Sequence, residues 1–552
     1  MINRPMKSMI LVVVVIIYAV FSVNVAFGDI AFLITPPNNS DYSVTADSVG
    51  TNLWDVTIDG TGTEDVLINI FGTTTTDNIR TLRVVKREGT HSLKVSIKDS
   101  SGSNNIANIT GLSTLGGTGA SIVYDQFPFD LQDITLTGGL TGTVRFNSLL
   151  GIIDVGGNIN ADIESLGDMN IIRADGYIRG RISTVTNDGC SNRYGRIRRI
   201  RADDDGDGIG DLGAPGASNW LKIDYGSLIT QAEQNTGNTG MELLQGANIY
   251  VDLNGTNGND DAVGFGNLGG WFGRLETTTP SGVFNGNFHV NRVVLTNGFE
   301  DMVINGNINA NIMIDWLWLA QLKCGGDFNG SITTGALFYD RDDNQPLNQG
   351  LEIFGDLNGA ICFGGHQSGT CGNDGSQCTE DAWNQDGNDD THKPVDSVEL
   401  PIIIHGDIGS NGSLSMGRTA DLGNSDTSNS TLIMDRTPGG RDGRIVVDGN
   451  LLGSINITGD VEGQIEILGS IANTGLFSID GSLLTTSLTE GRIIVHGDVD
   501  GELDISNDVD GGNGTNCIVD VQGNVNGFIN IGGSVLTDGE LFFDAINPTG
   551  EV

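Results

Sequence analysis

Basic residues are scarce in this sequence. It contains 28 Lys plus Arg against 70 Asp plus Glu over 552 residues, and its formal net charge is −42. Binding to nucleic acid or to an anionic membrane needs a basic face that can hold phosphates. We therefore expect no nucleic-acid partner. The acidity instead permits cation binding and suits a salty extracellular medium.

Long apolar runs are also lacking, with one exception at the N-terminus. Arg4 and Lys7 precede an apolar run over residues 9–23, and the segment 26–28 (AFG) places small residues where a signal peptidase reads them. The sequence therefore predicts a signal peptide over residues 1–28, removed by cleavage at its end. Such a protein is exported, and is either secreted or held at the cell surface.

An uncleaved membrane anchor is the alternative at the N-terminus, although the apolar run is short for a span. Further along, the most apolar segment is "IMIDWLWLAQL", which is too short to cross a bilayer and contains Asp315. We expect no transmembrane segment after signal cleavage.

Cysteine is sparse, and its spacing does not predict a zinc site. The six cysteines stand at positions 190, 324, 362, 371, 378 and 517, without a paired CxxC or matching His. In an exported chain they could form three disulfides, and a bridge between Cys371 and Cys378 is one plausible closure. The connectivity stays open.

Helical periodicity is hard to find in this sequence. The sequence contains an internal repeat instead. The stretches "VHGDVDGELDISN" and "VQGNVNGFINIGG" share a skeleton of glycines and alternating aliphatics at an offset of 26. Seven positions recur in register: Val495, Gly497, Val499, Gly501, Leu503, Ile505 and Val509 become Val521, Gly523, Val525, Gly527, Ile529, Ile531 and Val535. Ile479 stands 26 before Ile505, whereas Ile457 stands 22 before Ile479.

This pattern predicts an all-β fold. Aliphatic and polar residues alternate as in strands with one buried face, and glycines mark sharp bends. Short strands at a fixed period are typical of a solenoid whose coils stack about 4.8 Å apart. We therefore predict a parallel β-helix with coils of about 22–26 residues and several loop insertions.

Polar positions of the repeat support stacking independently. Asp498, Asp500 and Asp504 would lie beside Asn524, Asn526 and Asn530 of the next coil, so that each carboxylate meets a neutral side chain that can donate to it. Ordinary interchange of Asp and Asn in a chain rich in both is the alternative.

The repeat also predicts the domain organisation. Residues 29–150 are β-rich but irregular, and we predict that they form an N-terminal cap and the first coils. A separate β-sandwich is the alternative for this region. Residues 151–552 read as the parallel β-helix, in which Gly-Asp or Gly-Asn followed by an aliphatic recurs. Stretches near 186–224, 234–261, 365–399 and 417–443 break the pattern and read as loop insertions. Function on solenoids usually lies in such insertions.

One insertion contains a metal-binding spacing. In "DDDGDGIGD", Asp203, Asp205 and Asp207 take loop positions one, three and five, Ile209 supplies a backbone carbonyl at seven, and Asp211 stands at nine. This is the oxygen-ligand spacing that Ca²⁺ prefers, and the segment resembles the calcium loops of EF-hand, dockerin and thrombospondin type 3 repeats.

The resemblance covers about a dozen residues and is incomplete. Position twelve, where those loops place a further carboxylate, is Ala214. We therefore predict calcium as the cofactor, held with weak affinity. A solvated acidic loop without a specific ligand is the alternative.

Four arginines, at positions 196, 198, 199 and 201, form the most basic stretch just before this loop. β-Helix lyases resemble it in combining bound calcium with a basic residue that abstracts a proton. The non-catalytic alternative is charge balance, with the arginines paired to the adjacent aspartates. We prefer charge balance, because no second cluster of His, Lys or paired carboxylates is identifiable nearby.

By pattern the chain resembles secreted right-handed parallel β-helix proteins, the superfold of pectin lyases and many bacterial surface proteins. The segment "GDVEGQIEI" is also similar to the coils of bactofilins. The handedness is implied by the resemblance alone. We expect an exported, non-catalytic structural or adhesive β-solenoid that binds calcium, with polysaccharide or cell-surface material as candidate partners. The alternative is a carbohydrate-active β-helix enzyme, a polysaccharide lyase or hydrolase.

Overall fold

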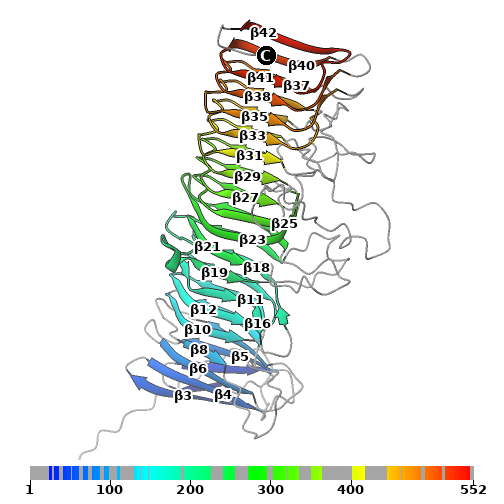
Figure 1. The fold of residues 1–552 in the computed structure, drawn as a ribbon. Helices are drawn as coiled ribbons and strands as arrows, with labels where there is room; N and C mark the ends of the chain where they lie inside the picture. Colours follow the sequence, from blue (N-terminus) through cyan, green and yellow to red (C-terminus); the bar gives the residue numbers. More distant parts are fainter. Residues whose placement is uncertain are drawn as a thin grey trace, which may run out of the picture.

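The strands stack along one axis and build an elongated rod (Figure 1). Before residue 130 this computed structural model describes only strands β1 to β8, and the rest of the described chain consists of residues 130–136, 138–146, 148–187, 192–225, 240–254, 271–294, 302–319, 321–334, 350–363, 401–416, 444–461, 463–485, 491–511 and 516–546. None of the described residues forms a helix long and apolar enough to cross a membrane.

One side of the rod is a ladder of parallel strands that we call ladder A. From the first coil to the last it contains β4 (Leu53–Gly60), β6 (Asn78–Lys86), β8 (Asn108–Gly111), β10 (Leu140–Phe146), β12 (Ile159–Ser165), β14 (Ile178–Arg179) with β15 (Arg181–Ser183), β19 (Leu221–Asp224), β21 (Ile249–Asn254), β23 (Phe284–Val294), β25 (Asn311–Leu319), β27 (Ser331–Thr334), β29 (Ala360–Phe363), β31 (Ser413–Met416), β33 (Ser454–Ile457), β35 (Leu476–Ile479), β38 (Glu502–Ile505) and β41 (Phe528–Ile531).

A second parallel ladder, ladder B, alternates with the first along the chain. It contains β5 (Val66–Gly72), β7 (Leu93–Lys98), β9 (Asp130–Leu136), β11 (Leu149–Val155), β13 (Met169–Ala174), β18 (Ile197–Arg201), β20 (Met241–Gly246), β22 (Trp271–Thr277), β24 (Met302–Ile304), β26 (Leu322–Cys324), β28 (Leu351–Ile353), β30 (Ile402–Ile404), β32 (Arg444–Val447), β34 (Gln464–Ile467), β37 (Arg492–Val495), β40 (Cys517–Val525) and β42 (Gly539–Ile546). Two long parallel ladders filled by alternating strands confirm the predicted parallel β-helix.

The remaining elements lie at the N-terminal end or in turns. β1 (Asn24–Phe27) pairs antiparallel with β2 (Ile30–Thr35), β2 with β5, and β3 (Tyr42–Gly50) with β4. Short pairs are formed by β16 (Val185–Asn187) with β17 (Asn192–Tyr194) and by β36 (Leu483–Leu484) with β39 (Val509–Asp510), and a 3₁₀ turn, η1, covers Ala217–Asn219.

The N-terminal region continues the same stack. From β4 and β5 onward, the strands described within 29–150 join ladders A and B by parallel pairing, with β2 and β3 added antiparallel at the end. β1 lies within residues 1–28, the expected signal peptide, and the cleavage site stays a prediction.

The register of the coils follows the repeat found in the sequence. Leu503 pairs with Ile529 at an offset of 26, and Val461 pairs with Leu483 at an offset of 22. Shorter coils also occur, because Leu140 pairs with Ile159 at an offset of 19. In that coil only positions 147 and 148 separate the end of β10 from the start of β11.

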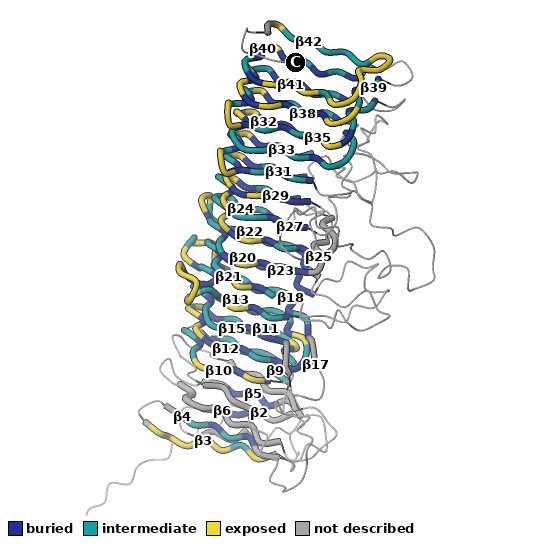
Figure 2. The backbone as a smooth tube through the Cα atoms, viewed as in Figure 1, coloured by how far each residue is buried: buried dark blue, intermediate teal, exposed yellow. Residues whose placement is uncertain are grey.

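The core is a continuous apolar interior along the rod (Figure 2). Alternate residues of each strand point inward, so that equivalent aliphatics of successive coils stack on one another. One such column runs through Ile304, Cys324, Ile353, Ile404, Val447, Ile467, Val495 and Val521, all of them inaccessible to solvent. Because each coil buries the next, stability depends on the register between neighbours.

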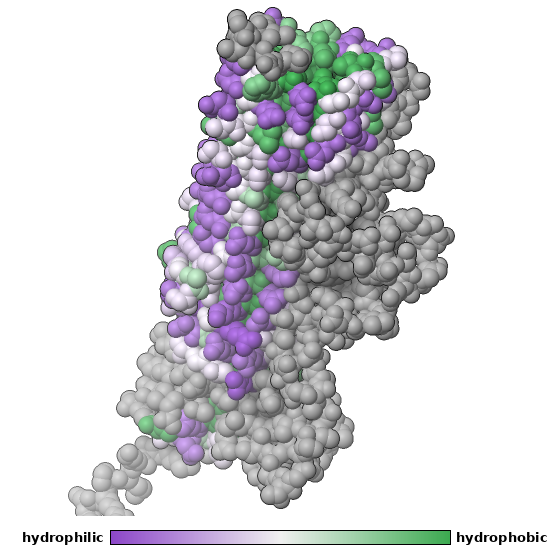
Figure 3. Space-filling view, in the orientation of Figure 1, coloured by the Kyte–Doolittle hydropathy of each residue, from purple (hydrophilic) through white to green (hydrophobic). Residues whose placement is uncertain are grey.

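The last described coil has no further coil to cover it. Val535 is 43% exposed there, whereas its equivalent Val509 on the preceding coil is fully buried. Phe528 and Phe542 add apolar surface on the outward faces of the strands, where they pair with Glu502 and Asp520 and are 53% and 48% exposed. Apolar surface is accordingly visible at the C-terminal end of the rod (Figure 3).

The recurring Gly-Asp and Gly-Asn motif has a structural explanation. Oδ1 of Asp327 accepts a hydrogen bond from the backbone N–H of Asp356 on the next coil at 3.0 Å, and Asp356 repeats this with Asp407 at 2.9 Å. A Cβ at Gly355 would lie 2.3 Å from Asp327 Oδ1, so only glycine fits beneath the accepting carboxylate. The motif therefore holds adjacent coils together.

Two of the expected insertions are narrower than predicted. Within 186–224, β18 and β19 are coil strands, and within 234–261, β20 and β21 are. These strands carry arginines or are flanked by polar turns, so the alternation of apolar and polar residues is hard to recognise in their sequences. The stretches 365–399 and 417–443 lie outside the described residues. Cys324 and Cys517 are free and buried, Cys362 is disulfide-bonded, and a bridge between Cys371 and Cys378 lies outside the described part of the chain.

Candidate metal site

The acidic loop leaves the rod directly after a buried strand residue. β18 pairs with β13 on one side and β20 on the other, and Ala202 after it is fully buried. The coil resumes at Leu212, which bridges Ile178 and Ile249 of the neighbouring coils. The loop between them thus starts and ends on a rigid frame.

Asp203 is the anchor of the loop. Its side chain is buried, with the residue only 3% exposed, and its backbone takes a left-handed φ of 59°. Oδ1 accepts from the N–H of Gly208 at 2.8 Å, and Oδ2 accepts from the hydroxyl of Thr278, 75 residues further along the chain. Gly206 and Gly208 have φ of 73° and 83°, values that glycine adopts without steric cost and that fold the loop back on itself.

Three carboxylates converge in this loop. Oxygens of Asp203, Asp205 and Asp207 lie within 4.8 Å of one another. Asp205 and Asp207 are exposed, and their Oδ1 atoms accept from the N–H groups of Asp207 (3.3 Å) and Ile209 (2.9 Å). Hard cations such as Ca²⁺ bind to oxygen clusters of this kind.

Asp211 does not join the cluster, in contrast to the expectation from loop spacing. Its Oδ1 accepts from the backbone N–H of Asn248 at 3.1 Å and from Asn248 Nδ2 at 2.9 Å. The physical reason is that Gly210-Asp211-Leu212 is also the repeat motif of the coil, so the Asp211 carboxylate is used between coils. Ile209 lies in the loop with 73% of its surface exposed.

The fourth aspartate of the loop, Asp204, turns toward the arginines. It forms ion pairs with Arg201 at 2.8 Å and with Arg173 at 3.3 Å. Arg173 is also bound to both oxygens of Asp154, at 2.9 and 2.8 Å. The basic stretch and the loop are therefore parts of one charge network on ladder B.

The other arginines of the basic stretch are paired as well. Arg198 and Arg199 share Glu242 of the next coil at 2.6 and 2.5 Å, and Arg196 lies 3.6 Å from Asp168. Burial of Glu242 opposes ionisation, but hydrogen bonds from the two arginines outweigh it and lower the pKa of this carboxyl. These pairs agree with charge balance, although most of the carboxylates come from neighbouring coils.

The loop leaves negative potential around it. Burial, together with repulsion from Asp205 and Asp204, raises the pKa of Asp175 on the preceding coil. A cation at the loop would relieve this repulsion.

Sequence reasoning missed the partners that the coils contribute. Thr278 lies 75 positions from Asp203, Glu242 lies 43 positions from Arg199, and Asp175 belongs to the preceding coil. No local motif marks these residues. Only the register of the coils identifies these neighbours.

Comparison with protein-family models, with curated protein sequences and with solved structures finds no match to this chain.

Proposed function

We propose that this protein is an exported, non-catalytic β-solenoid with a structural or adhesive role, and that Ca²⁺ bound to the Asp203 loop stabilises it. The observation that supports this most is the convergence of Asp203, Asp205 and Asp207 on a loop fixed at both ends to the rod. The resemblance of the loop to EF-hand, dockerin and thrombospondin type 3 calcium loops supports the same ligand.

The ligand set explains the expected weakness of binding. The three carboxylates and the backbone carbonyl of Ile209 are the proposed protein ligands, whereas Ca²⁺ takes six to eight oxygens. Asp211 is engaged with Asn248, and Ala214 supplies no carboxylate. Water would complete the shell, which supports weak affinity of the kind that extracellular calcium modules have.

A structural role follows from the charge of the rod. With a net charge of −42, self-repulsion opposes the compact state, and a divalent cation at the loop offsets it locally. The arginines near the loop are held in ion pairs with carboxylates, so none is offered here as the proton-abstracting base of a lyase. The carbohydrate-active enzyme is thus the less supported alternative.

Two measurements on the full chain test this proposal. Isothermal calorimetry should detect saturable Ca²⁺ binding that Mg²⁺ at equal ionic strength does not reproduce. A polysaccharide panel scored for product release should show no cleavage with or without Ca²⁺. Release of reducing ends or unsaturated products would establish the enzyme instead, and equal heats for both ions would mean diffuse screening of an acidic surface.

A further inference from the structure

An exposed face of ladder A carries two columns of uncharged side chains, most of them polar. We call it the amide face; its first column is Asn285, Asn309, Asn329 and Asn358, and its second is Asn287, Asn311, Ser331, Ala360, Ser413 and Ser454. The columns are two residues apart along each strand, so both point to the same side. Asn287, Asn309, Asn311, Asn329 and Asn358 are all exposed.

The amides in the first column form a chain of hydrogen bonds along the rod. Nδ2 of Asn309 donates to Asn285 Oδ1 at 3.0 Å, Asn329 to Asn309 at 2.9 Å, and Asn358 to Asn329 at 3.2 Å. In the second column Asn311 Nδ2 donates to Asn287 Oδ1 at 3.3 Å. These bonds fix the rotamers and orient the amides.

The oriented amides keep hydrogen-bond donors and acceptors that are available to a ligand from solvent. An amide has two N–H donors and an oxygen with two lone pairs, and each bond along the column uses one donor and one acceptor site. Every asparagine therefore keeps a donor and an acceptor, repeated at the coil spacing of about 4.8 Å. Preorganised groups of this kind bind without a large loss of side-chain entropy.

The amide face carries no formal charge in a strongly acidic chain. From Asn285 to Ser454, neither column contains Asp, Glu, Lys or Arg. Carboxylates begin just outside it. Asp327 and Asp356 stand two residues before Asn329 and Asn358, and their Oδ1 atoms accept backbone N–H groups of the next coil. Along the rod, carboxylates begin at Asp252 on the coil before and at Asp500 and Glu502 on a later coil. The outward column of ladder B over comparable coils does carry charge, at Glu276, Lys323, Glu352 and Glu466.

The chemistry of this face selects its partner. Hydroxyl groups both donate and accept hydrogen bonds and so match amides that offer both. A basic protein would bind better to the acidic surfaces, and a protein interface would need an apolar or aromatic centre, in which serine is depleted. An anionic polymer would be repelled by the rod as a whole.

We propose that the amide face binds an uncharged polysaccharide whose chain runs along the rod axis. The inference rests on the proposed non-catalytic binding scaffold and specifies the ligand class and the surface for its adhesive role. It needs no cation, because none of the amide-face residues belongs to the Asp203 loop. If the calcium proposal fails, the proposal of polysaccharide binding is unaffected. Cleavage of the bound polymer would instead contradict the proposed non-catalytic function.

The test is pull-down of the full chain by cellulose, chitin, mannan and dextran resin, with pectate as the acidic comparison. The double variant Asn309→Asp, Asn358→Asp changes one atom in each of two side chains and places two negative charges two coils apart on the face. The matched control, Asn170→Asp with Gln522→Glu, adds the same charge to ladder B, at a partly exposed and an exposed position respectively. Circular dichroism and melting curves verify that all three proteins are folded.

We expect the wild type and the control to bind at least one neutral polymer and not pectate, and the Asn309/Asn358 variant to bind that polymer at least tenfold more weakly. No binding to any neutral polymer, or binding unaffected by the variant, overturns the proposal. Sedimentation that shows wild-type self-association lost in the variant also overturns it, because the face would then join two copies of the chain.

Discussion

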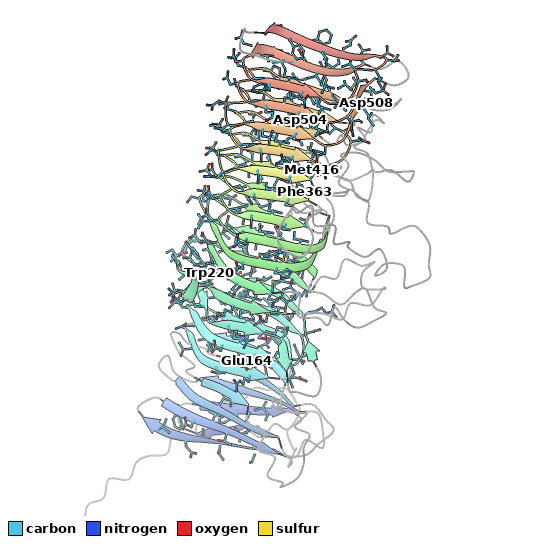
Figure 4. The ribbon with its side chains drawn as sticks, viewed as in Figure 1. Glu164, Trp220, Phe363, Met416, Asp504 and Asp508 are labelled. Atoms are coloured by element: carbon cyan, nitrogen blue, oxygen red, sulfur yellow. The ribbon has the colours of Figure 1, made fainter. Side chains whose placement is uncertain are left out.

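Asn530 on β41 donates a hydrogen bond from Nδ2 to Oδ1 of Asp504 on β38, 2.8 Å away on the preceding coil. Figure 4 labels Asp504 among the C-terminal coils. Two further pairs repeat this arrangement: Asn524 donates to Asp498 at 3.1 Å, and Asn526 to Asp500 at 2.7 Å. The stacking of carboxylate on amide predicted from the 26-residue offset is confirmed. An acidic rod thereby avoids placing like charges at the spacing of adjacent strands.

The Asp504–Asn530 pair predicts a compensating exchange. Asn530→Asp should lower the free energy of unfolding by about 1 kcal/mol, because it removes the donor and stacks two carboxylates. The exchanged double variant Asp504→Asn, Asn530→Asp should recover most of that loss. Urea unfolding of the wild type, the two single variants Asp504→Asn and Asn530→Asp, and the double variant at low salt measures the coupling. Equal destabilisation by the single and double variants would show that the pair does not interact.

The interior predicts a large effect from a single buried charge. Ile505 is fully buried and pairs with Ile479 and Ile531 on the neighbouring coils. Ile505→Asp should therefore cost several kcal/mol and open the C-terminal coils to protease. Ser506→Asp, at the exposed next position, is the control and should leave stability nearly unchanged. Similar melting and protease resistance in both variants would contradict the stacked register.

His405 predicts a pH-dependent contribution to stability. Nδ1 lies 2.7 Å from Asp448 Oδ2, and Nε2 lies 3.3 Å from Glu352 Oε1. Burial opposes the charged ring, but the two carboxylates outweigh it and raise the pKa of His405 above its ordinary value of 6.5. This stabilisation is fully present below about pH 6.5 and is lost as the pH rises through the folded-state pKa.

The measurement compares melting temperatures of the wild type and His405→Gln at about pH 5.5 and about pH 8.5. We expect the wild type to exceed the variant by a larger margin at the lower pH. A margin that is the same at both pH values, or larger at the higher one, would mean that the carboxylates do not hold the protonated ring.

The fold was predictable because equivalent residues of neighbouring C-terminal coils recur at the same offset in the sequence. Leu503 and Ile529 mark equivalent sites at a constant offset, and their pairing follows directly. The strands β18 to β21 were harder to recognise, because long loops separate them and arginines such as Arg199 occupy their outward positions. Insertions of variable length remove the fixed offset on which register prediction depends.

The candidate site was only partly predictable for a related reason. The spacing of Asp203, Asp205 and Asp207 correctly indicates a local cluster, because a glycine-containing loop of this length folds back on itself. Asp211 belongs to two patterns at once, the metal-loop spacing and the Gly-Asp coil motif, and in the structure it serves the coil. Thr278 reaches Asp203 only through coil stacking, which no local pattern encodes.

Differential stabilisation by calcium tests the central proposal most directly. A ligand that binds only the folded form raises its melting temperature by mass action. Ca²⁺ at about 1 mM should raise the melting temperature and slow proteolysis of the Asp203 loop more than Mg²⁺ at equal ionic strength, because Mg²⁺ dehydrates reluctantly. The double variant Asp205→Asn, Asp207→Asn should abolish that difference. The control Asp480→Asn, Glu502→Gln, which removes the same charge at exposed positions elsewhere, should keep it. Equal protection by both ions, or a calcium effect that survives in the Asp205/Asp207 variant, would contradict a specific site.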